Sequence, residues 1–287
     1  MSQPHPGQIL RSGSEGFLRL LFGVFLAVIA VVLALGPARW FAIITVVMAL
    51  FAAREWHRLV RSPAQRAAAD RPLHVQTAIT VLAIALAVTA LLFHQLVLAG
   101  LLLAAGAVAS FAWARAHKDY PFWHASGVLY IGLPCLALVG LQALAPQGPQ
   151  IVLGLFLIVW ATDTGALVFG KLIGGRKIAP RLSPGKTWAG TIGGSVCAAL
   201  VFGLYIAFFG FKVLPAMVFA LVFSLAAHGG DLLESAVKRH FGTKDSGGLI
   251  PGHGGVLDRM DSMFASSVVL ALLVFGLHLN PLFGGHA

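Results

Sequence analysis

Charged residues are scarce in this sequence of 287 residues. Asp, Glu, Lys and Arg together make up 10% of it, whereas hydrophobic residues make up 58%. A soluble domain carries about 25% charged residues. The apolar residues also come in blocks of the length that crosses a bilayer, so a water-soluble fold would leave too little polar surface to hydrate. The composition therefore excludes a soluble globular protein.

Cysteine is equally rare. Cys135 and Cys197 both lie inside apolar blocks and show no Cys-x-x-Cys spacing. They are most simply small buried residues, and neither a disulfide nor a zinc site is indicated. Acidic residues are few, which leaves a formal net charge of +10. The basic residues are scattered through short loops and form no long patch, so we expect no nucleic-acid partner.

The apolar blocks predict an all-α, polytopic integral membrane protein with about nine transmembrane helices. Each block has the roughly 20 apolar residues that a spanning helix needs. The first is too long for the apolar core of a signal peptide and has no obvious cleavage site, so we expect it to be retained. The predicted spans are residues 17–36, 39–57, 75–94, 96–114, 125–144, 149–171, 188–210, 213–238 and 263–283.

The basic residues support this count. If successive loops alternate between the two sides of the membrane, eighteen of the twenty Lys and Arg residues share a side with the N-terminus. Only Arg39 and Lys212 fall on the other side. Such an asymmetry is typical of cytoplasmic loops. It predicts a cytoplasmic N-terminus, an external C-terminus and a location in the bacterial cytoplasmic membrane.

The acidic residues divide the chain into two parts. Six of the ten lie between residues 163 and 261. We therefore expect residues 1–145 to be transmembrane scaffold and residues 146–287 to be the catalytic region. The acids of the first part all lie near predicted span ends; they are Glu15, Glu55, Asp70 and Asp119.

Asp163 lies within an apolar run, residues 151–173. A charge inside a span costs about 2.5–3.5 kcal/mol on insertion scales, so such a residue usually has a functional or pairing role. The alternative is a hydrogen bond to a neighbouring helix near the cytoplasmic end. The small residues that follow, Gly165, Ala166 and Gly170, permit close approach of a helix or a ligand.

The end of the eighth predicted span carries a polar stripe. Asp231, Glu234, Ser235 and Lys238 stand at positions i, i+3, i+4 and i+7, which places them on one helical face. A polar stripe on an apolar helix must face protein or a water-filled cavity. The alternative is a helix end held by salt bridges, such as one between Glu234 and Lys238.

A glycine-rich loop follows this helix and leads to Asp258, Arg259 and Asp261. Carboxylates from two helix ends could converge on a hard cation, and Mg²⁺ often takes one or two carboxylates together with substrate phosphates. At least five basic residues are expected on the same side of the membrane. Together these residues favour a metal–phosphate site. His253, in the same loop, could donate to a phosphate or cap the next helix.

A second loop, residues 174–187, contributes four basic residues. Its last three residues, Gly185-Lys186-Thr187, match the last three positions of the P-loop motif. That motif also needs a glycine at the position of Pro180 and a preceding strand. We expect no strand here and exclude a Walker ATPase. A phosphate-binding loop before a helix N-terminus remains reasonable, because free N–H groups there favour anions. The alternative is an anchor on anionic lipid.

Residues 235–261, from the end of the eighth predicted span to the acids before the ninth, resemble a known family, the phosphatidate cytidylyltransferases, also called CDP-diacylglycerol synthases. The resemblance rests on Ser235-Ala-Val-Lys238-Arg239, four further residues, Lys244-Asp245, and then Pro251-Gly-His253-Gly254-Gly255-Val-Leu-Asp258-Arg259-Met-Asp261. Two shorter stretches are also similar: Asp163-Thr-Gly-Ala166 with Gly170-Lys171, and Ser183-Pro-Gly-Lys186-Thr187-Trp188. The resemblance covers residues 160–262 sharply and the earlier spans only generally. Relatives often carry Glu where this chain has Ala189.

The resemblance implies an all-helical, usually dimeric membrane enzyme that transfers CMP from CTP to phosphatidate and releases pyrophosphate. It implies Mg²⁺, with room for a second metal ion, on the acids that match Asp231 and Asp258. We assign catalytic roles to Asp231, Asp258, Lys238 and Lys244, and phosphate binding to Lys186, Ser183, Ser235, Arg239, His253 and Arg259. Supporting roles go to Asp163, Glu234, Asp245 and Asp261.

Two other functions remain open. A secondary transporter for an anionic solute would share the intramembrane acid and the basic residues, but we find no internal repeat of the kind expected for many such folds. A different CTP-using lipid enzyme, such as a polyprenol kinase, would share the site chemistry.

Overall fold

The structure is a computed structural model that describes most of the chain. The described residues are 23–25, 27–66, 71–247, 255–277, 279–280 and 285–286. Some sequence predictions fall partly or wholly outside them. His253 is not among the described residues, and neither are the beginning of the predicted span 17–36 and the end of the predicted span 263–283.

Helices make up nearly all of the described chain. They are α2 (Ala38–Leu59), α3 (Pro63–Arg66), α4 (Arg71–Leu92), α5 (Leu96–Ala116), α6 (Pro121–Gln142), α7 (Gly148–Leu172), α8 (Trp188–Phe208), α9 (Val213–His240), α10 (Leu257–Ala271) and a short π-helix, η1 (Leu272–Gly276). A shorter apolar helix, Gly23–Leu35, precedes α2. Two small hairpins complete the fold: β1 (Lys177–Ala179) with β2 (Ser183–Thr187), and β3 (Leu279–Asn280) with β4 (Gly285–His286).

Seven helices in the described part are long and apolar enough to cross a membrane. They are Leu73–Leu92, Leu96–Ala116, Pro121–Gln142, Gly148–Leu172, Trp188–Phe208, Val213–His240 and Leu257–Gly276. The protein is therefore an all-α integral membrane protein. Helix α2 is also 22 residues long, but four charged residues lower its hydropathy: Arg39, Arg54, Glu55 and Arg58. The count of nine spans and their orientation stay predictions.

The last span begins earlier than the sequence predicted. Its helix starts at Leu257 instead of residue 263, so Asp258 and Asp261 lie within its first two turns. Hydropathy placed the boundary too late because these acids lower the average over the first turns. The acids are therefore carried on a rigid helix, which sets their directions.

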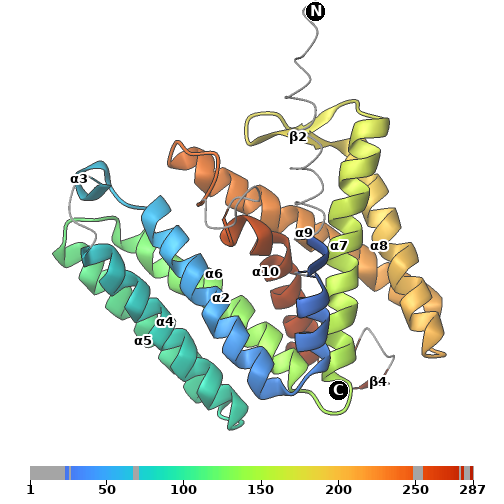
Figure 1. Ribbon diagram of the computed structural model, residues 1–287, viewed down its shortest axis with the longest axis horizontal. Helices are drawn as coiled ribbons and strands as arrows, with labels where there is room; N and C mark the ends of the chain where they lie inside the picture. Colours follow the sequence, from blue (N-terminus) through green and yellow to red (C-terminus); the bar gives the residue numbers. More distant parts are fainter. Residues whose placement is uncertain are drawn as a thin grey trace, which may run out of the picture.

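The helices form two groups that Figure 1 shows side by side. Helices α2, α4, α5 and α6 pack together in one group, and α7, α8, α9 and α10 in the other. Consecutive long helices are antiparallel neighbours, as the short links predicted. Between α4 and α5, for example, His94 turns the chain with a φ of 60°.

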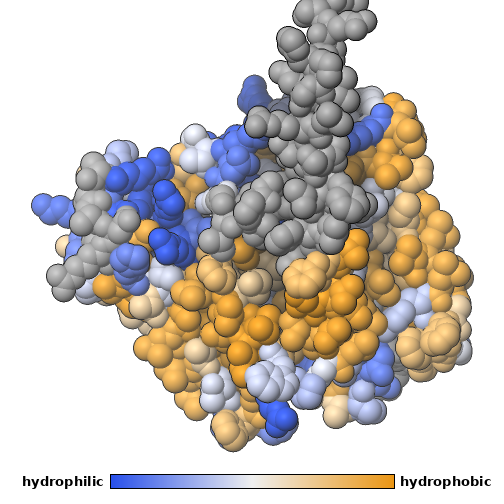
Figure 2. Space-filling model, viewed as in Figure 1, coloured by the Kyte–Doolittle hydropathy of each residue, from blue (hydrophilic) through white to orange (hydrophobic). Residues whose placement is uncertain are grey.

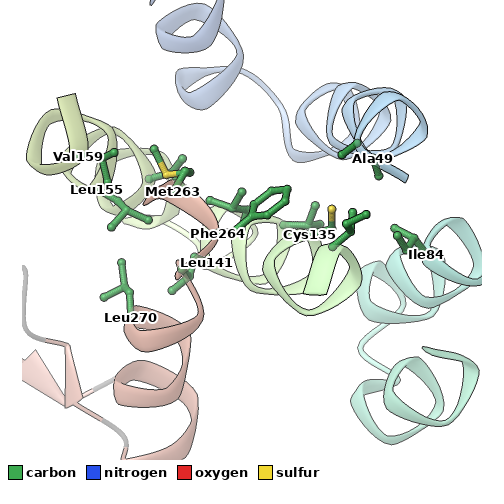
Figure 3. Close-up of a cluster of buried hydrophobic side chains, with 14 of the residues drawn as sticks. Ala49, Ile84, Cys135, Leu141, Leu155, Val159, Met263, Phe264 and Leu270 are labelled. Carbon is green, nitrogen blue, oxygen red and sulfur yellow. The ribbon is translucent and has the colours of Figure 1, made fainter. Parts of the chain in front are cut away.

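Helix α10 joins the two groups, because it packs on α6 as well as on α7 and α9. Figure 3 shows its side chains Met263, Phe264 and Leu270 among Cys135 and Leu141 of α6 and Leu155 and Val159 of α7. The core continues to Ala49 of α2 and Ile84 of α4. Cys135 is buried, as predicted, whereas Cys197 is only partly buried; both are free thiols.

Helices α7 and α8 approach each other closely through small residues. A Cβ atom on Gly194 would lie 2.5 Å from the carbonyl oxygen of Thr162, and one on Gly165 would lie 2.9 Å from the Cα of Gly194. Backbone contact of this kind is possible only where side chains are absent. The small residues after Asp163 therefore serve helix packing, one of the two uses that the sequence predicted.

Large apolar side chains cover much of the outer surface. Figure 2 shows hydrophobic residues over most of the visible middle of the molecule, and hydrophilic residues at the upper left near α3, along the top and at the lower edge. Val97, Leu172 and Leu204 are each more than 70% exposed. A soluble monomer rarely exposes such continuous apolar surface, whereas lipid-facing helices require it.

The basic loop before α8 contains a short antiparallel hairpin. Lys177 pairs with Thr187, and Ala179 pairs with Ser183. The expectation that this loop has no strand is therefore wrong. Pro180 lies in the turn between the strands, where its missing N–H interrupts no ladder bond. The hairpin is still not a P-loop, because its strands are antiparallel and position 180 is not glycine.

Candidate active site

A polar cavity of about 430 Å³ lies where α7, α8, α9, α10 and strand β2 meet. Ionisable and hydroxyl side chains form much of its wall, although the helices that carry them are apolar. It is lined by Asp163, Ala166, Leu167, Gly185, Lys186, Thr187, Gly190, Thr191, His228, Asp231, Lys238, Asp258, Arg259, Asp261 and Ser262. Seven of these are predicted site residues: Asp163, Lys186, Asp231, Lys238, Asp258, Arg259 and Asp261.

The polar stripe of α9 faces this cavity and the helix behind it. The hydroxyl of Ser235 donates to Oδ1 of Asp231 at 3.4 Å, and Nζ of Lys238 lies 3.3 Å from Oε1 of Glu234. Both pairs are one helical turn apart, so the predicted common face is confirmed. Glu234 is fully buried, whereas Asp231 and Lys238 reach the cavity.

Strand β2 carries Lys186 over the cavity. Its Nζ lies 2.5 Å from Oδ2 of Asp231 on α9. The next residue, Thr187, is the N-cap of α8, where its hydroxyl oxygen accepts from the N–H of Gly190 at 3.0 Å. Because this cap fixes the junction between β2 and α8, the position of Lys186 is set by the start of the helix.

Lys238 joins α9 to the first turn of α10. Its Nζ donates to Oδ1 of Asp258 at 2.7 Å. The same carboxylate accepts from the backbone N–H of Gly255 at 2.9 Å and from that of Ser246 at 3.2 Å. Asp258 therefore bonds to backbone N–H groups at both described ends of the glycine-rich loop, and it also lines the cavity.

The remaining predicted site residues do not line the cavity. Arg239 is exposed, and its guanidinium donates to the carbonyl oxygens of Leu182 and Thr243. Lys244 and Asp245 are exposed in the loop after α9. The others are Ser183 at the start of β2, and Ser235 and Glu234, which lie beside lining residues. The roles given to these residues stay predictions, and His253 lies outside the described part of the chain.

Three polar lining residues were missed by the sequence analysis: Thr191, His228 and Ser262. His228 is nearly buried, and its Nε2 has no hydrogen-bond partner among the described residues. Its signal was present, because it stands three residues before Asp231 and extends the polar stripe by one turn. Thr191 and Ser262 carry no such signal, since hydroxyl residues are common in membrane helices.

The charges around the cavity fit a bound cation better than a bare anion. Four carboxylates line it, Asp163, Asp231, Asp258 and Asp261, against three cationic side chains, Lys186, Lys238 and Arg259. Carboxylate oxygens are the ligands that Mg²⁺ prefers. In the described part of the chain, no group of three or more His, Cys, Asp and Glu side chains is arranged to hold a metal. Mg²⁺ commonly takes only one or two protein carboxylates and completes its coordination with substrate phosphates and water.

Comparison with known proteins identifies relatives of this chain. A profile of the cytidylyltransferase family matches residues 17–277. The phosphatidate cytidylyltransferase of Brucella suis is 47% identical over 154 residues, which cover 52% of this chain and 56% of that protein. That of Staphylococcus saprophyticus is 40% identical over 150 residues, covering 51% and 56%. That of Staphylococcus aureus (strain COL) is 48% identical over 131 residues, covering 45% and 50%.

These alignments span about half the length of the curated relatives. The family profile extends further, over all the described helices from α2 to α10 and over the hairpin that carries Lys186. It therefore includes every residue that lines the cavity. On this match, the chain belongs to the cytidylyltransferase family.

Proposed function

We propose that the protein is a phosphatidate cytidylyltransferase, which transfers CMP from CTP to phosphatidate and releases CDP-diacylglycerol and pyrophosphate. One observation carries the proposal: a cavity with charges of both signs is built at the ends of apolar helices. A reaction between a lipid phosphate and a nucleotide needs such a place, because the acyl chains stay in the bilayer while the head group meets a water-soluble partner. The names of the relatives support the same reaction.

The reaction requires no nucleophile from the protein. A phosphate oxygen of phosphatidate forms a bond to the α phosphorus of CTP, and the bond from that phosphorus to the oxygen bridging to the β phosphate breaks. Pyrophosphate carries away the electron pair. The hydroxyl of Ser235 is bonded to Asp231, and the sequence has no histidine within one helical turn of it. Positioning and charge stabilisation then provide the catalysis.

The ion pairs around the cavity are arranged to exchange partners. Lys186 and Lys238 are held by Asp231 and Asp258, the two acids that we propose as ligands of Mg²⁺. The ion would supply charge neutralisation between the two polyanionic substrates. With these carboxylates engaged, both lysines can turn to phosphate oxygens, and Arg259 provides a third positive charge at the wall.

Several further features belong to the same proposal. We place the cavity at the cytoplasmic face of the bacterial inner membrane, since the basic loops lie at that end, and we expect a homodimer and up to two metal ions. Residues 146–287 would form the catalytic region and residues 1–145 its scaffold. Arg239, in the last turn of α9, and Lys244, in the loop after it, would contact the nucleotide. Ala189 lies in the first turn of α8, so any role of the Glu found there in relatives must be absent or met by another acid.

An assay of the purified protein with labelled CTP and a panel of lipid phosphates tests the proposal. We expect phosphatidate-dependent formation of CDP-lipid and pyrophosphate that requires Mg²⁺. With free polyprenol added to the panel, formation of polyprenyl phosphate and CDP would show a kinase instead. If no lipid phosphate causes CTP consumption, the enzyme assignment is wrong and solute uptake into proteoliposomes becomes the measurement to make.

The stereochemistry of the product tests the direct mechanism. One displacement inverts the configuration at the α phosphorus, whereas two successive displacements retain it. With CTP made chiral at that phosphorus, we expect inversion in the CDP-lipid and no exchange of pyrophosphate with CTP in the absence of lipid. Retention, with label trapped on the protein, would show a covalent intermediate.

A further inference from the structure

Glu55 is a buried acid of α2 that contacts the start of α10, about 200 residues later in the chain. Only 7% of its surface is exposed. Its Oε2 accepts from the N–H of Leu257 at 2.8 Å, and its Oε1 accepts from the N–H of Val256 at 3.1 Å. Burial of a carboxylate is costly unless hydrogen bonds replace water, and here backbone donors at a helix N-terminus do so.

The same carboxylate also touches both ends of the glycine-rich loop. The hydroxyl of Ser246 lies 3.4 Å from Oε2 of Glu55. A Cβ atom on Gly247 would come within 2.5 Å of Oε1, and one on Gly255 within 2.6 Å of Oε2. Glycine at these two positions is therefore a requirement of the close approach to Glu55.

Asp258 holds the loop ends from the opposite side. It accepts from the backbone N–H groups of Ser246 and Gly255, while Glu55 accepts from those of the next two residues, Val256 and Leu257. The two acids differ in their surroundings, because Asp258 lines the cavity and pairs with Lys238 whereas Glu55 does not line it. Asp258 can exchange its partners for a cation only if something else keeps the first turn of α10 in place.

We propose that Glu55 is a positioning residue for the transfer reaction. It fixes the N-terminus of α10, so that Asp258 and Arg259 keep their directions toward the cavity when Lys238 moves from Asp258 to a phosphate. The inference rests on the proposed function and deepens it. It also gives the first group of helices a part in the chemistry that a passive scaffold would not have.

Glu55→Gln is the first variant to make, since it preserves the shape but replaces one accepting oxygen by an NH₂ group. That group would face a backbone N–H donor, so one of the two bonds from backbone N–H groups is lost. Loss of a residue that orients a metal ligand usually costs about tenfold to a hundredfold in activity or metal affinity. We expect a kcat lower by that factor, a higher Mg²⁺ concentration for half-maximal rate, and a KM for CTP changed by less than about threefold.

Asp119→Asn is the matched control. Asp119, in the link between α5 and α6, is another acid that accepts two backbone N–H groups, from Ser62 at 2.8 Å and Tyr120 at 2.9 Å. Within the described residues, its carboxylate bonds to these two residues and to His124 of α6, and to none of α10. Its variant should lose thermal stability while kcat and the Mg²⁺ requirement stay within about twofold of wild type. If Asp119→Asn reproduces the kinetic defect of Glu55→Gln, the effect is general destabilisation and the inference is wrong.

Gly247→Ala tests the contact from the loop side if Glu55→Gln does not fold. The added methyl group would displace the Glu55 carboxylate, so we expect the same kinetic defect. Gly100→Ala, where a Cβ would meet nothing within 4 Å, is the control for a glycine substitution. If Gly247→Ala keeps the wild-type kcat and the wild-type Mg²⁺ requirement, the inference is wrong.

Hydrogen exchange at the amides of Val256 and Leu257 separates this inference from the proposed function. Measured in detergent without substrate, exchange at these amides should be faster in Glu55→Gln than in wild type, and unchanged in Asp119→Asn. If the wild-type protein consumes no CTP with any lipid phosphate, the function fails but this measurement still decides whether Glu55 holds α10. Unchanged exchange in Glu55→Gln would overturn the positioning role.

Discussion

The polar side chains inside the two groups of helices have different partners. In the group of α2, α4, α5 and α6, several polar side chains are paired with one another: Gln76 with Ser110, and His57 with both Thr80 and His124. In the group of α7 to α10, acids and lysines are paired across a cavity of about 430 Å³. Buried polar groups need partners in both cases. Within the described residues, the first set borders a cavity of about 10 Å³, the size of a single water, whereas the second set borders a space large enough for a ligand to replace those partners.

The chain of contacts in the first group ends at Asp119. Nε2 of His124 lies 3.0 Å from this carboxylate, and the N–H of Ser62 donates to it at 2.8 Å. Burial by itself would raise the pKa of Asp119, but the hydrogen bonds from His124 and Ser62 hold the pKa below its usual value. The acid is therefore satisfied by fixed neighbours, which makes it a structural residue of the bundle.

Neutralising the cavity acids tests most directly whether the second group of helices carries the active site. Asp231→Asn and Asp258→Asn should each reduce CTP turnover at least about a hundredfold, because they remove groups that we expect to hold charge at the reacting phosphates. Both variants should still insert and purify normally. Near-normal turnover of either variant in Mg²⁺ would show that its carboxylate is not a metal ligand.

A comparison of two lysines tests whether the cavity wall contributes more to phosphate binding than the loop after α9. Lys186 lines the cavity and pairs with Asp231, whereas Lys244 is exposed outside it. Lys186→Met should lower kcat/KM by about tenfold to a hundredfold, and Lys244→Met should lower it by a smaller factor. Steady-state kinetics at saturating Mg²⁺ measures both. A larger defect in Lys244→Met would mean that the loop after α9 supplies more of the phosphate binding than the cavity wall.

In the first group, the expected effect is on stability. Asp119→Asn removes a charged acceptor from two backbone N–H groups and should destabilise the protein by about 1–3 kcal/mol at neutral pH. Because the pKa of Asp119 is lower in the folded state, its contribution is fully present above the unfolded pKa of about 3.9 and is lost as the pH falls through the lower, folded value. Thermal melting of both proteins in detergent at several pH values measures this. A difference that grows on acidification would contradict the sign.

Topology is the prediction with no expected effect on activity. The charge asymmetry predicts that a tag after Ala287 is accessible from outside and that a tag inserted at residues 67–69 is accessible only from the cytoplasm. Labelling with a membrane-impermeant reagent before and after permeabilisation distinguishes the two sides. Both tags on one side would exclude the nine-span arrangement.

Much of the fold and part of the site could be predicted from the sequence because the signals are local. An apolar block reports a span through its length, and residues 231 and 238 share a face through helical periodicity alone. The hairpin before α8 was missed because its strands are only three and five residues long and lack alternating hydrophobicity. The start of α10 was placed too late because its first turns are acidic.

The sequence by itself determined that this protein lies in a membrane, that its acids gather in the second half, and that Asp231 and Lys238 face the same way. Only the tertiary structure decided that Lys186 meets Asp231, that Lys238 meets Asp258, and that Glu55 holds the start of α10. The physical reason is that helical periodicity sets directions within one helix, whereas contacts between helices depend on how each is rotated and tilted against its neighbours. Packing of small residues and of the shared core sets those rotations.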